Sequence, residues 1–376
     1  MEAEELRPTL ENLPPELLSH ILTFVDDAGS LLALSRTSAA CREAAHADAL
    51  WRALALRRWG WLCRQPDAHT PWRAWYARLH AGDFAFHVVG GARNGHGRVL
   101  CRGQWHDAPP MECERNSAAL ARSTEGELVV FGGRAERALR SVEVLCPRRG
   151  EWLAAPPMEL ERCCPAAVSL GEWGRGAAAF LVAGGGESMF RHARVYETVE
   201  LYDLAAGSGR AFPSLGVARC AHSLAVSARG HVYATGGYGG GLSYLSSVES
   251  LDLSCPERGW LRVAEMAEAR AGATGCFGPD HCLYVAGGGD DGTTNFSSAV
   301  KWDPRSGRWL RLASMHHRRH YFAGSFAPDG VLYVAGGFEW TAHLSSAECY
   351  DPRADKWRLL PDFGAYMEFC SGAFLW

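Results

Sequence analysis

The sequence has 376 residues, of which 47% are apolar, and a formal net charge of −4. These values indicate a folded globular chain with room for one large domain and a small one, and they exclude wholesale disorder and a broadly basic surface that would recruit nucleic acid. The acidic start MEAEELRPTL lacks the basic-then-apolar layout of a secretory signal, and no apolar run approaches the ~18 residues of a membrane-spanning helix.

The thirteen cysteines are odd in number and include no C-x-x-C pair. This pattern argues against a disulfide framework and against a zinc knuckle. Most of the cysteines are expected to be small buried hydrophobic residues in a reducing compartment, so we expect a cytoplasmic or nuclear protein.

The first 83 residues are rich in helix formers. Residues 1–10 are expected to form a flexible N-terminus, residues 11–59 a small all-α domain, and residues 60–83 a linker with one more helix. In LPPELLSHILTFV the apolar residues recur at three- and four-residue intervals after two prolines, as in an amphipathic helix. Shorter helices are expected in SLLALSRTS, AACREAAHAD and ALWRALALRRWG.

The order and spacing of LPPELLSHILTFV, LLALSRTSAACREAA and ALWRALALRRW resemble an F-box. The segment Ala40–Glu43 departs from the family pattern because no tryptophan occurs there. The resemblance implies binding to a Skp-type adaptor and, through it, to a cullin ligase complex. By this resemblance, seven residues are expected to contact the adaptor or to support the residues that do: Leu13, Pro14, Leu17, Ile21, Leu22, Leu31 and Leu34. The alternative is an inert helical cap, but the broad apolar surface of so small a block favours a docking partner.

A repeat fills residues 84–376. Short apolar runs such as FHVV, LVVF and LYVA predict buried strands. Each run is followed by a glycine pair, and these pairs begin at Gly90, Gly132, Gly184, Gly236, Gly287 and Gly336. Alternating segments such as SVEVL and SAECYD then predict strands covered on one face. A tryptophan closes most units, and the third unit carries Phe212 instead.

Each unit predicts a four-stranded antiparallel sheet that is too small to bury its own faces, so we expect the sheets to stack in a ring. The glycine pairs, the alternating strand with Tyr or Trp before Asp, and the spaced tryptophans resemble kelch repeats. The first unit begins at its second strand, FAFHVVGG, and the last leaves an extra strand, AYMEFCSGAFLW. We therefore expect an all-β six-bladed kelch β-propeller, closed by the C-terminal strand, with a small N-terminal all-α F-box domain.

An arginine recurs at the entry of the first strand of five units: Arg115, Arg162, Arg219, Arg270 and Arg319. Because first strands line the channel of a propeller, these residues are expected to ring one mouth and to bind a substrate with an acidic or phosphorylated peptide. The closing strand places Met367 or Glu368 there, which leaves a gap. The alternative is structural, with each arginine bonding carbonyls of the neighbouring blade.

Enzyme functions find little support. The cluster His316, His317 and His320 sits beside two arginines that repel a metal cation, and DDGTT lacks the other ligands of a calcium loop. No phosphate-binding loop or nucleophile elbow occurs. We expect no catalytic residue, metal or cofactor. The leading hypothesis is the substrate-recognition subunit of an SCF-type ubiquitin ligase, and the alternative is an interaction scaffold without a ligase. A small-molecule-binding or catalytic propeller is a third, weaker hypothesis.

Overall fold

The computed structural model describes residues 50–51, 85–90 and 97–375, except residues 102, 147–148, 175–177, 189–191, 242, 291–293, 340–341, 365–366 and 368–369. The chain divides into two units, of which the second comprises Phe84–Cys146 and Glu151–Leu375. The predicted N-terminal helices and the seven predicted adaptor-binding residues lie outside the described residues. From that part only Leu50 and Trp51 are described, and both are helical and buried.

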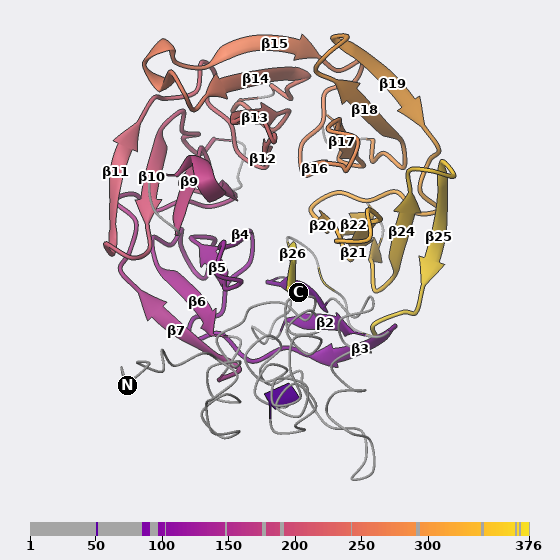
Figure 1. Ribbon diagram of the computed structural model, residues 1–376, viewed down its shortest axis with the longest axis horizontal. Helices are drawn as coiled ribbons and strands as arrows, with labels where there is room; N and C mark the ends of the chain where they lie inside the picture. Colours follow the sequence, from indigo (N-terminus) through magenta and orange to yellow (C-terminus); the bar gives the residue numbers. More distant parts are fainter. Residues whose placement is uncertain are drawn as a thin grey trace, which may run out of the picture. The chain divides into compact units, whose positions relative to one another are not determined.

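The second unit is a propeller of six four-stranded antiparallel sheets arranged around a central channel (Figure 1). This confirms the predicted fold class and the number of blades. The strands, grouped by blade from the channel outward, are as follows: blade 1, β26 (Ser371–Leu375), β1 (Ala85–Val89), β2 (Arg98–Cys101) and β3 (Gln104–Asp107); blade 2, β4 (Ala119–Arg122), β5 (Leu128–Phe131), β6 (Val142–Cys146) and β7 (Glu151–Ala155); blade 3, β8 (Ala166–Ser169), β9 (Ala179–Ala183), β10 (Val199–Asp203) and β11 (Ser208–Phe212); blade 4, β12 (Ser223–Val226), β13 (His231–Thr235), β14 (Ser247–Asp252) and β15 (Leu261–Glu265); blade 5, β16 (Thr274–Phe277), β17 (Leu283–Ala286), β18 (Ala299–Asp303) and β19 (Arg308–Leu312); blade 6, β20 (Ala323–Phe326), β21 (Leu332–Ala335), β24 (Ala347–Asp351) and β25 (Lys356–Leu360).

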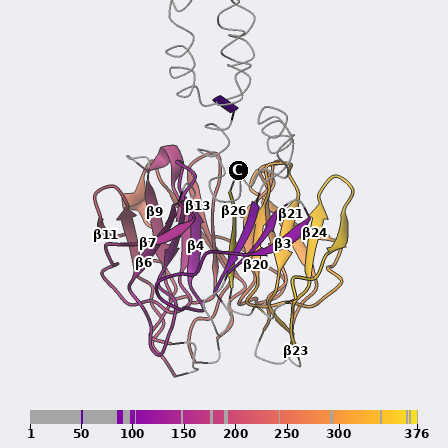
Figure 2. The ribbon, with the colours of Figure 1, turned by 90° about the horizontal axis from the view of Figure 1, so that it is seen from below.

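Three small elements lie between these strands. Two 3-10 turns, η3 (Gly171–Trp173) and η4 (Pro256–Arg258), connect strands within blades 3 and 4. The hairpin of β22 (Phe338–Glu339) and β23 (Ala342–His343) lies between the second and third strands of blade 6. Because neighbouring strands are antiparallel, the loops between second and third strands lie on the same face as the connections from one blade to the next. Figure 2 shows β23 at this face.

The ring closes through the two ends of the propeller sequence. β26 pairs with β1 in an antiparallel register that runs from Ala85 opposite Leu375 to Val89 opposite Ser371. The C-terminal strand thus supplies the innermost strand of blade 1, as expected from the unpaired strand at the end of the sequence. Closure leaves neither terminal blade with an uncovered face, which removes a surface that would otherwise pair with other chains.

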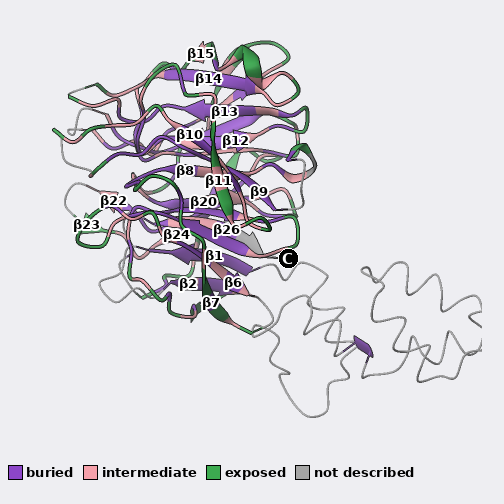
Figure 3. Ribbon diagram, turned by 90° about the vertical axis from the view of Figure 1, so that its left-hand side faces the viewer, coloured by how far each residue is buried: buried purple, intermediate pink, exposed green. Residues whose placement is uncertain are grey.

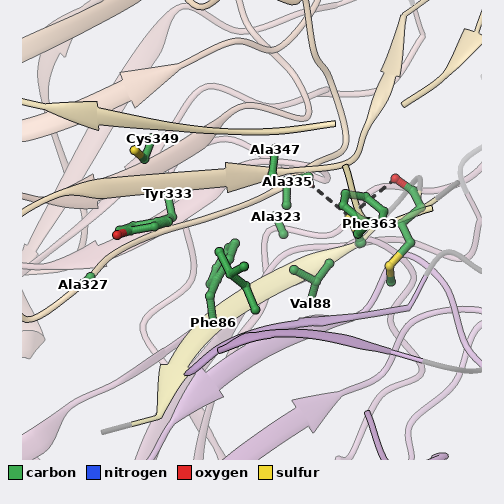
Figure 4. Packing of buried hydrophobic residues seen from close by; sticks show 12 residues of the cluster. Phe86, Val88, Ala323, Ala327, Tyr333, Ala335, Ala347, Cys349 and Phe363 are labelled. Carbon is green, nitrogen blue, oxygen red and sulfur yellow. Dashed lines mark hydrogen bonds between the residues drawn. The ribbon is translucent and has the colours of Figure 1, made fainter. Parts of the chain in front are cut away.

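The hydrophobic core lies between neighbouring blades. Between blades 6 and 1, Phe86 and Val88 of β1 pack with Ala323 and Tyr333, and all four residues are buried (Figure 4). The rings of Phe86 and Tyr333 lie 6.3 Å apart. Buried positions follow the inner strands of the sheets, and exposed positions lie on the outer strands and in the loops (Figure 3). Each blade therefore depends on its neighbours for burial, as the repeat predicts.

The outer-strand tryptophans occupy one register position, and the structure corrects the residue expected in blade 3. Trp152 lies opposite Leu145 and Trp357 lies opposite Tyr350. The corresponding residue opposite Tyr202 is Gly209, whereas the sequence analysis assigned Phe212. The reason is that aromatic character alone does not determine the register of an edge strand.

Four of these tryptophans bond their blade to the connection that precedes it. Their indole N–H groups donate to carbonyls of that connection: Trp105 to Pro361 at 2.8 Å, Trp152 to Pro109 at 3.1 Å, Trp260 to Pro213 at 2.8 Å and Trp357 to Ala313 at 2.9 Å. In blade 3 the hydroxyl of Tyr202 donates to the carbonyl of Pro156 at 2.6 Å. Tyr202 therefore replaces the missing tryptophan as the donor of this hydrogen bond.

The glycine pairs allow adjacent blades to approach closely. The N–H of Gly237 donates to the carbonyl of Arg270 in the next blade at 2.7 Å. Gly237 has φ of +100°, and a Cβ at this position would lie 2.7 Å from the Cβ of His222. Only glycine combines this backbone conformation with the available space.

Candidate functional site

The five arginines of the predicted ring are buried at the entries of their blades. Their exposed fractions are 3% for Arg115, 1% for Arg162, 0% for Arg219, 1% for Arg270 and 0% for Arg319. The sequence analysis located the series correctly along the chain. However, the side chains lie inside the protein rather than on the wall of an open mouth.

Each guanidinium ties together two strands of its own blade. In blade 4, Nη1 of Arg219 donates to the carbonyls of Gly236 at 2.7 Å and Ser247 at 3.0 Å. Arg319 makes the same pair of bonds to Gly336 and Ser346. The structural alternative considered above expected carbonyls of the neighbouring blade, and this detail is wrong. The reason is that the arginine side chain lies against the end of the second strand and the start of the third strand of its own sheet.

The link between blades comes from the backbone of the same arginines. The carbonyl of Arg219 accepts a hydrogen bond from Gly185, and that of Arg319 accepts one from Gly288, both at 2.8 Å. In the closing strand, Met367 holds this place, because its carbonyl accepts from Gly337 at 2.7 Å. The series of arginines therefore has its gap at Met367, one of the two residues that the sequence analysis named for it.

A glutamate on the third strand completes the arrangement in four blades, and the sequence analysis did not single it out. These residues are Glu143, Glu200, Glu249 and Glu348, with exposed fractions from 0% to 3%. Glu249 accepts from Nη2 of Arg219 at 2.8 Å, and Glu348 accepts from Nη2 of Arg319 at 3.0 Å. The sequence does contain a signal for these glutamates, because a glutamate recurs at the same position of the alternating strands SVEVL, TVELYD, SVESLD and SAECYD.

The glutamates also bind the backbone of the connection that enters the blade. Glu348 accepts the N–H groups of His316 at 2.8 Å and His317 at 3.0 Å. Burial acts to raise the pKa of Glu348, but the charge of Arg319 and these hydrogen bonds outweigh it and hold the pKa below its usual value. In blade 3 burial dominates and raises the pKa of Glu200. The arginine and the glutamate are thus ion-paired in blades 2, 4 and 6, and in blades 2, 3, 4 and 6 the glutamate fixes the incoming connection to its sheet.

Blade 5 has an arginine of the series but no such glutamate. Its third strand carries Val300 at the position of the glutamate in blades 2, 3, 4 and 6, and Arg270 is paired instead with Glu268 of the connection. Beside these residues lies a pocket of about 200 Å³. Arg270 thus lines a pocket in which its carboxylate partner comes from the connection and not from the third strand.

The central channel is neutral. A cavity of about 110 Å³ is lined by residues from all six blades, among them Cys164, His222 and Tyr321. Burial lowers the pKa of His222 to about 3, so its imidazole is uncharged near neutral pH. Burial raises the pKa of Tyr321 well above its usual value. This lining offers no charged group for binding an ion or for acid–base chemistry.

Two of the three histidines considered as metal ligands, His316 and His320, have other partners. Nδ1 of His316 lies 2.8 Å from Glu348, and Nδ1 of His320 lies 2.8 Å from the carbonyl of Phe338. Within the part of the chain that the structure describes, no group of three or more histidine, cysteine or acidic side chains is placed to hold a metal ion. In DDGTT, the side chain of Asp290 accepts the N–H of Thr294 at 3.0 Å, and residues 291–293 lie outside the described residues.

Two further expectations concern cysteines and membranes. The eleven cysteines among the described residues are all free thiols, and the neighbouring sulfurs of Cys163 and Cys164 lie 3.9 Å apart. The described part of the chain contains no helix with the length and apolarity needed to cross a membrane.

Comparison with known proteins bears on both regions of the chain. The F-box-like family model matches residues 10–57, and the kelch motif model matches residues 115–159, 219–266, 270–316 and 319–364. The four kelch matches fall on blades 2, 4, 5 and 6. Blade 3, which lacks the tryptophan, is outside them. Both resemblances identified in the sequence are therefore confirmed.

Similarity to individual proteins is confined to the fold. No curated protein matches the sequence. A solved structure titled "Structure of YjhT" is 12% identical and superposes with a TM-score of 0.62, covering 74% of this chain and 95% of that chain. At this identity the likeness shows a common propeller fold alone. The chain therefore combines an F-box-like segment with a propeller of kelch motifs, which is the organisation of an F-box/kelch-repeat protein.

Proposed function

We propose that this chain is the substrate-recognition subunit of an SCF-type ubiquitin ligase. The observation that carries the proposal is the succession of an F-box-like segment at residues 10–57 and a closed propeller of kelch motifs. Proteins with these two parts are generally non-catalytic adaptors. The chain performs no chemistry itself; it raises the effective concentration of substrate lysines near a conjugating enzyme.

The first interface is the F-box. Its apolar residues dock on a Skp-type adaptor, which connects the chain to a cullin scaffold in the cytoplasm or nucleus. The residues predicted to bind the adaptor or to support that surface remain Leu13, Pro14, Leu17, Ile21, Leu22, Leu31 and Leu34. The physical basis is burial of a few leucine and isoleucine side chains, which together supply most of the affinity of a small helical interface.

The second interface is the propeller, which binds the protein substrate. Direct contact of Arg115, Arg162, Arg219, Arg270 and Arg319 with an acidic or phosphorylated degron remains a prediction. Their burial and their internal hydrogen bonds favour the structural role for the four arginines outside blade 5. These arginines support the face on which the blade connections lie, and exposed residues of that face make the contacts.

Capture of a purified Skp-type adaptor by the full-length chain tests the proposal. We expect Leu17→Asp to weaken capture by more than about tenfold, because an aspartate cannot enter an apolar interface without losing its hydration. Leu359→Asp is the matched control, since Leu359 is 54% exposed on β25 of the propeller, and we expect it to leave capture unchanged. Failure of the wild-type chain to bind the adaptor would reject the ligase function and favour the interaction scaffold.

A further inference from the structure

Blade 5 lacks the carboxylate that its repeat position calls for. Val300 occupies on β18 the place that Glu249 occupies on β14 and Glu348 occupies on β24. The strand registers agree with this alignment. Val300 pairs with Val285 on the second strand and with Arg311 on the fourth, just as Glu348 pairs with Val334 and Leu359 in blade 6. A carboxylate that is buried in blades 2, 3, 4 and 6, and ion-paired in blades 2, 4 and 6, is therefore replaced here by an uncharged side chain.

The loss of the carboxylate leaves donors without their acceptor. In blades 2, 3, 4 and 6 the glutamate accepts N–H groups of the incoming connection, for example Gly216 at 2.8 Å from Glu249. The corresponding residues of blade 5 are Ala267 and Glu268, in the connection MAEAR. Among the described residues no hydrogen bond is made by the N–H of either one. Two residues that line the pocket of blade 5 thus have backbone N–H groups without an acceptor among the described residues.

The indole of blade 5 is a third donor without a partner. The Nε1 of Trp309 is buried and, within the described part of the chain, has no hydrogen-bond partner. The tryptophans of blades 1, 2, 4 and 6 donate to a carbonyl of the preceding connection. In blade 5 the corresponding carbonyl belongs to Ala264, and β15 continues past this residue to Glu265. A buried indole N–H without an acceptor is costly, so an acceptor that reaches it gains free energy.

These features surround one pocket of about 200 Å³, which is lined by Ala267, Glu268, Arg270, Val300, Trp309 and Arg311 among others. Arg270 is buried, and its Nη2 also donates to the hydroxyl of Ser298 at 2.6 Å. Arg311 lies directly opposite Val300 and is exposed. Two guanidinium groups and three unpaired N–H donors favour an anion with planar, bidentate acceptors.

Glu268 fills the vacancy in part. Its carboxylate pairs with Nη2 of Arg270, yet its side chain remains 40% exposed, whereas Glu348 of blade 6 is fully buried in its ion pair. Glu268 belongs to the connection rather than to the sheet, and its carboxylate is accessible to solvent. An external carboxylate would therefore compete with Glu268 for Arg270.

We propose that this pocket binds the carboxylate of a glutamate or aspartate side chain in a peptide segment of the substrate, which takes the place of the missing repeat glutamate. A carboxylate fits because it is the group found at the equivalent position in blades 2, 3, 4 and 6. Leu310, which lines the pocket and is 52% exposed, provides apolar surface for a neighbouring residue of the peptide. This inference rests on the proposed function, because it names the chemistry by which the propeller recognises its substrate.

Peptide binding to the full-length chain tests the site. The probe is a fluorescein-labelled peptide with a central Leu-Glu-Leu, uncharged flanking residues and an amidated C-terminus, followed by fluorescence anisotropy. We expect replacement of the glutamate by glutamine to weaken binding by about tenfold or more, since a neutral amide loses the two charge-assisted interactions. Peptides with phosphoserine in place of glutamate, or with the C-terminus as the only carboxylate, are expected to bind less tightly. Tighter binding of either one would overturn the assignment.

The most direct variant restores at position 300 the glutamate that four other blades carry. Val300→Glu places a carboxylate inside the pocket, so we expect it to fold and to weaken peptide binding by about tenfold or more. Val263→Glu is the matched control: Val263 is exposed on β15 and is not among the residues lining the pocket, so the variant adds the same charge outside the site. Peptide binding that survives in a folded Val300→Glu protein would overturn the proposal.

A second pair of variants keeps the test informative if Val300→Glu does not fold. Arg311→Ala is expected to weaken binding severalfold, whereas Arg262→Ala, at the same register position opposite Glu249 of blade 4, is expected to leave it unchanged. Glu268→Gln removes the internal competitor and is expected to strengthen binding severalfold. Equal effects of the two arginine variants, or no gain from Glu268→Gln, would contradict the site.

Adaptor capture separates this proposal from the function on which it rests. If Val300→Glu loses the peptide but still captures the Skp-type adaptor, both proposals are supported. If the wild-type chain captures the adaptor and the peptide binds regardless of the pocket variants, the site is wrong and the ligase function stands. If the chain binds the peptide through the pocket but never the adaptor, the carboxylate site stands and the ligase function is wrong.

Discussion

Arg319 and Glu348 form an ion pair from which solvent is excluded, with Nη2 and Oε1 3.0 Å apart and neither side chain exposed. The pair joins the connection that enters blade 6 to the third strand of that blade, and the carboxylate also holds two backbone N–H groups of the connection. The arginines that the sequence analysis predicted to meet a substrate are buried and bonded within their own blades, and their contact with a substrate stays a prediction. Because these arginines are buried, we expect substitutions at them to lower the stability of the fold, and this effect has to be measured before any effect on substrate binding.

Arg319→Ala is expected to lower the free energy of unfolding by about 3–5 kcal/mol, because it leaves Glu348 as an uncompensated buried charge. Urea denaturation of the full-length chain measures the change. Arg353→Ala is the control, since its ion pair with Asp351 is 79% and 36% exposed. An exposed pair contributes less than about 1 kcal/mol, so this variant should be nearly neutral. If Arg319→Ala were as stable as the wild type but lost its substrate, the arginine would be a direct substrate contact after all.

Gly237→Ala is expected to destabilise the propeller more than Gly241→Ala does. Both glycines have positive φ, +100° and +65°, but an added Cβ meets the Cβ of His222 at 2.7 Å only at position 237, and nothing lies within 4 Å at position 241. The backbone strain of a single residue is on the order of 1–3 kcal/mol, and the steric clash adds to it at Gly237. Thermal unfolding of the two variants measures the difference. Equal losses would show that the blades do not approach as closely as Gly237 implies.

The buried neutral histidine of the channel makes stability depend on pH. The pKa of His222 falls from 6.5 to about 3 on folding, so the unfolded chain binds more protons than the folded one between these values. Stability is therefore complete above about pH 6.5 and decreases by up to about 1.4 kcal/mol for each pH unit below it, until the folded pKa is reached.

His222→Gln removes this contribution. We expect the decrease in melting temperature between pH 7 and about pH 5 to be smaller in the variant than in the wild type, whatever the effect of the substitution at pH 7. His343→Gln serves as control, because His343 is exposed on β23. A pH dependence identical in wild type and His222→Gln would contradict the burial of an uncharged imidazole at this position.

The scarcity of lysine gives a prediction about self-modification, which rests on the proposed function. The chain has two lysines, Lys301 and Lys356. Nζ of Lys301 is bonded to Asp280 at 3.1 Å and its side chain is 25% exposed, whereas Lys356 is exposed on β25. In a reconstituted ligase reaction without substrate, we expect Lys356→Arg to remove most lysine-linked ubiquitin from the chain. We expect Lys301→Arg to remove little, and the reverse order would contradict the exposure of the two side chains.

Much of the architecture could be read from the repeat. The spacing of the glycine pairs, the apolar runs before them and the unpaired strand at the end of the sequence predicted six blades and the closure of the ring, because each blade needs a neighbour on both faces. The register of single residues could not be predicted in the same way. Phe212 was assigned to the tryptophan position that Gly209 holds, since an exposed outer strand carries little information about its alignment.

The site was predicted less well, for a physical reason. Alternation along a strand distinguishes two faces, and the polar face is ordinarily taken as solvated. In this protein the glutamates of that face are bonded to the connection that enters their own blade, so only the tertiary structure reveals that they are buried.

The amino-acid sequence by itself determined the number of blades, the order of their strands and the F-box-like and kelch character of the two regions. These properties depend on local periodicity and on repetition, which a single chain displays directly. The tertiary structure alone decided which charged residues are buried, which carbonyls the arginines bind, and that Val300 leaves a vacancy beside Arg270. Such features depend on which groups are brought together across strands and between blades, and no pattern along the chain specifies the free energy of a charge removed from water.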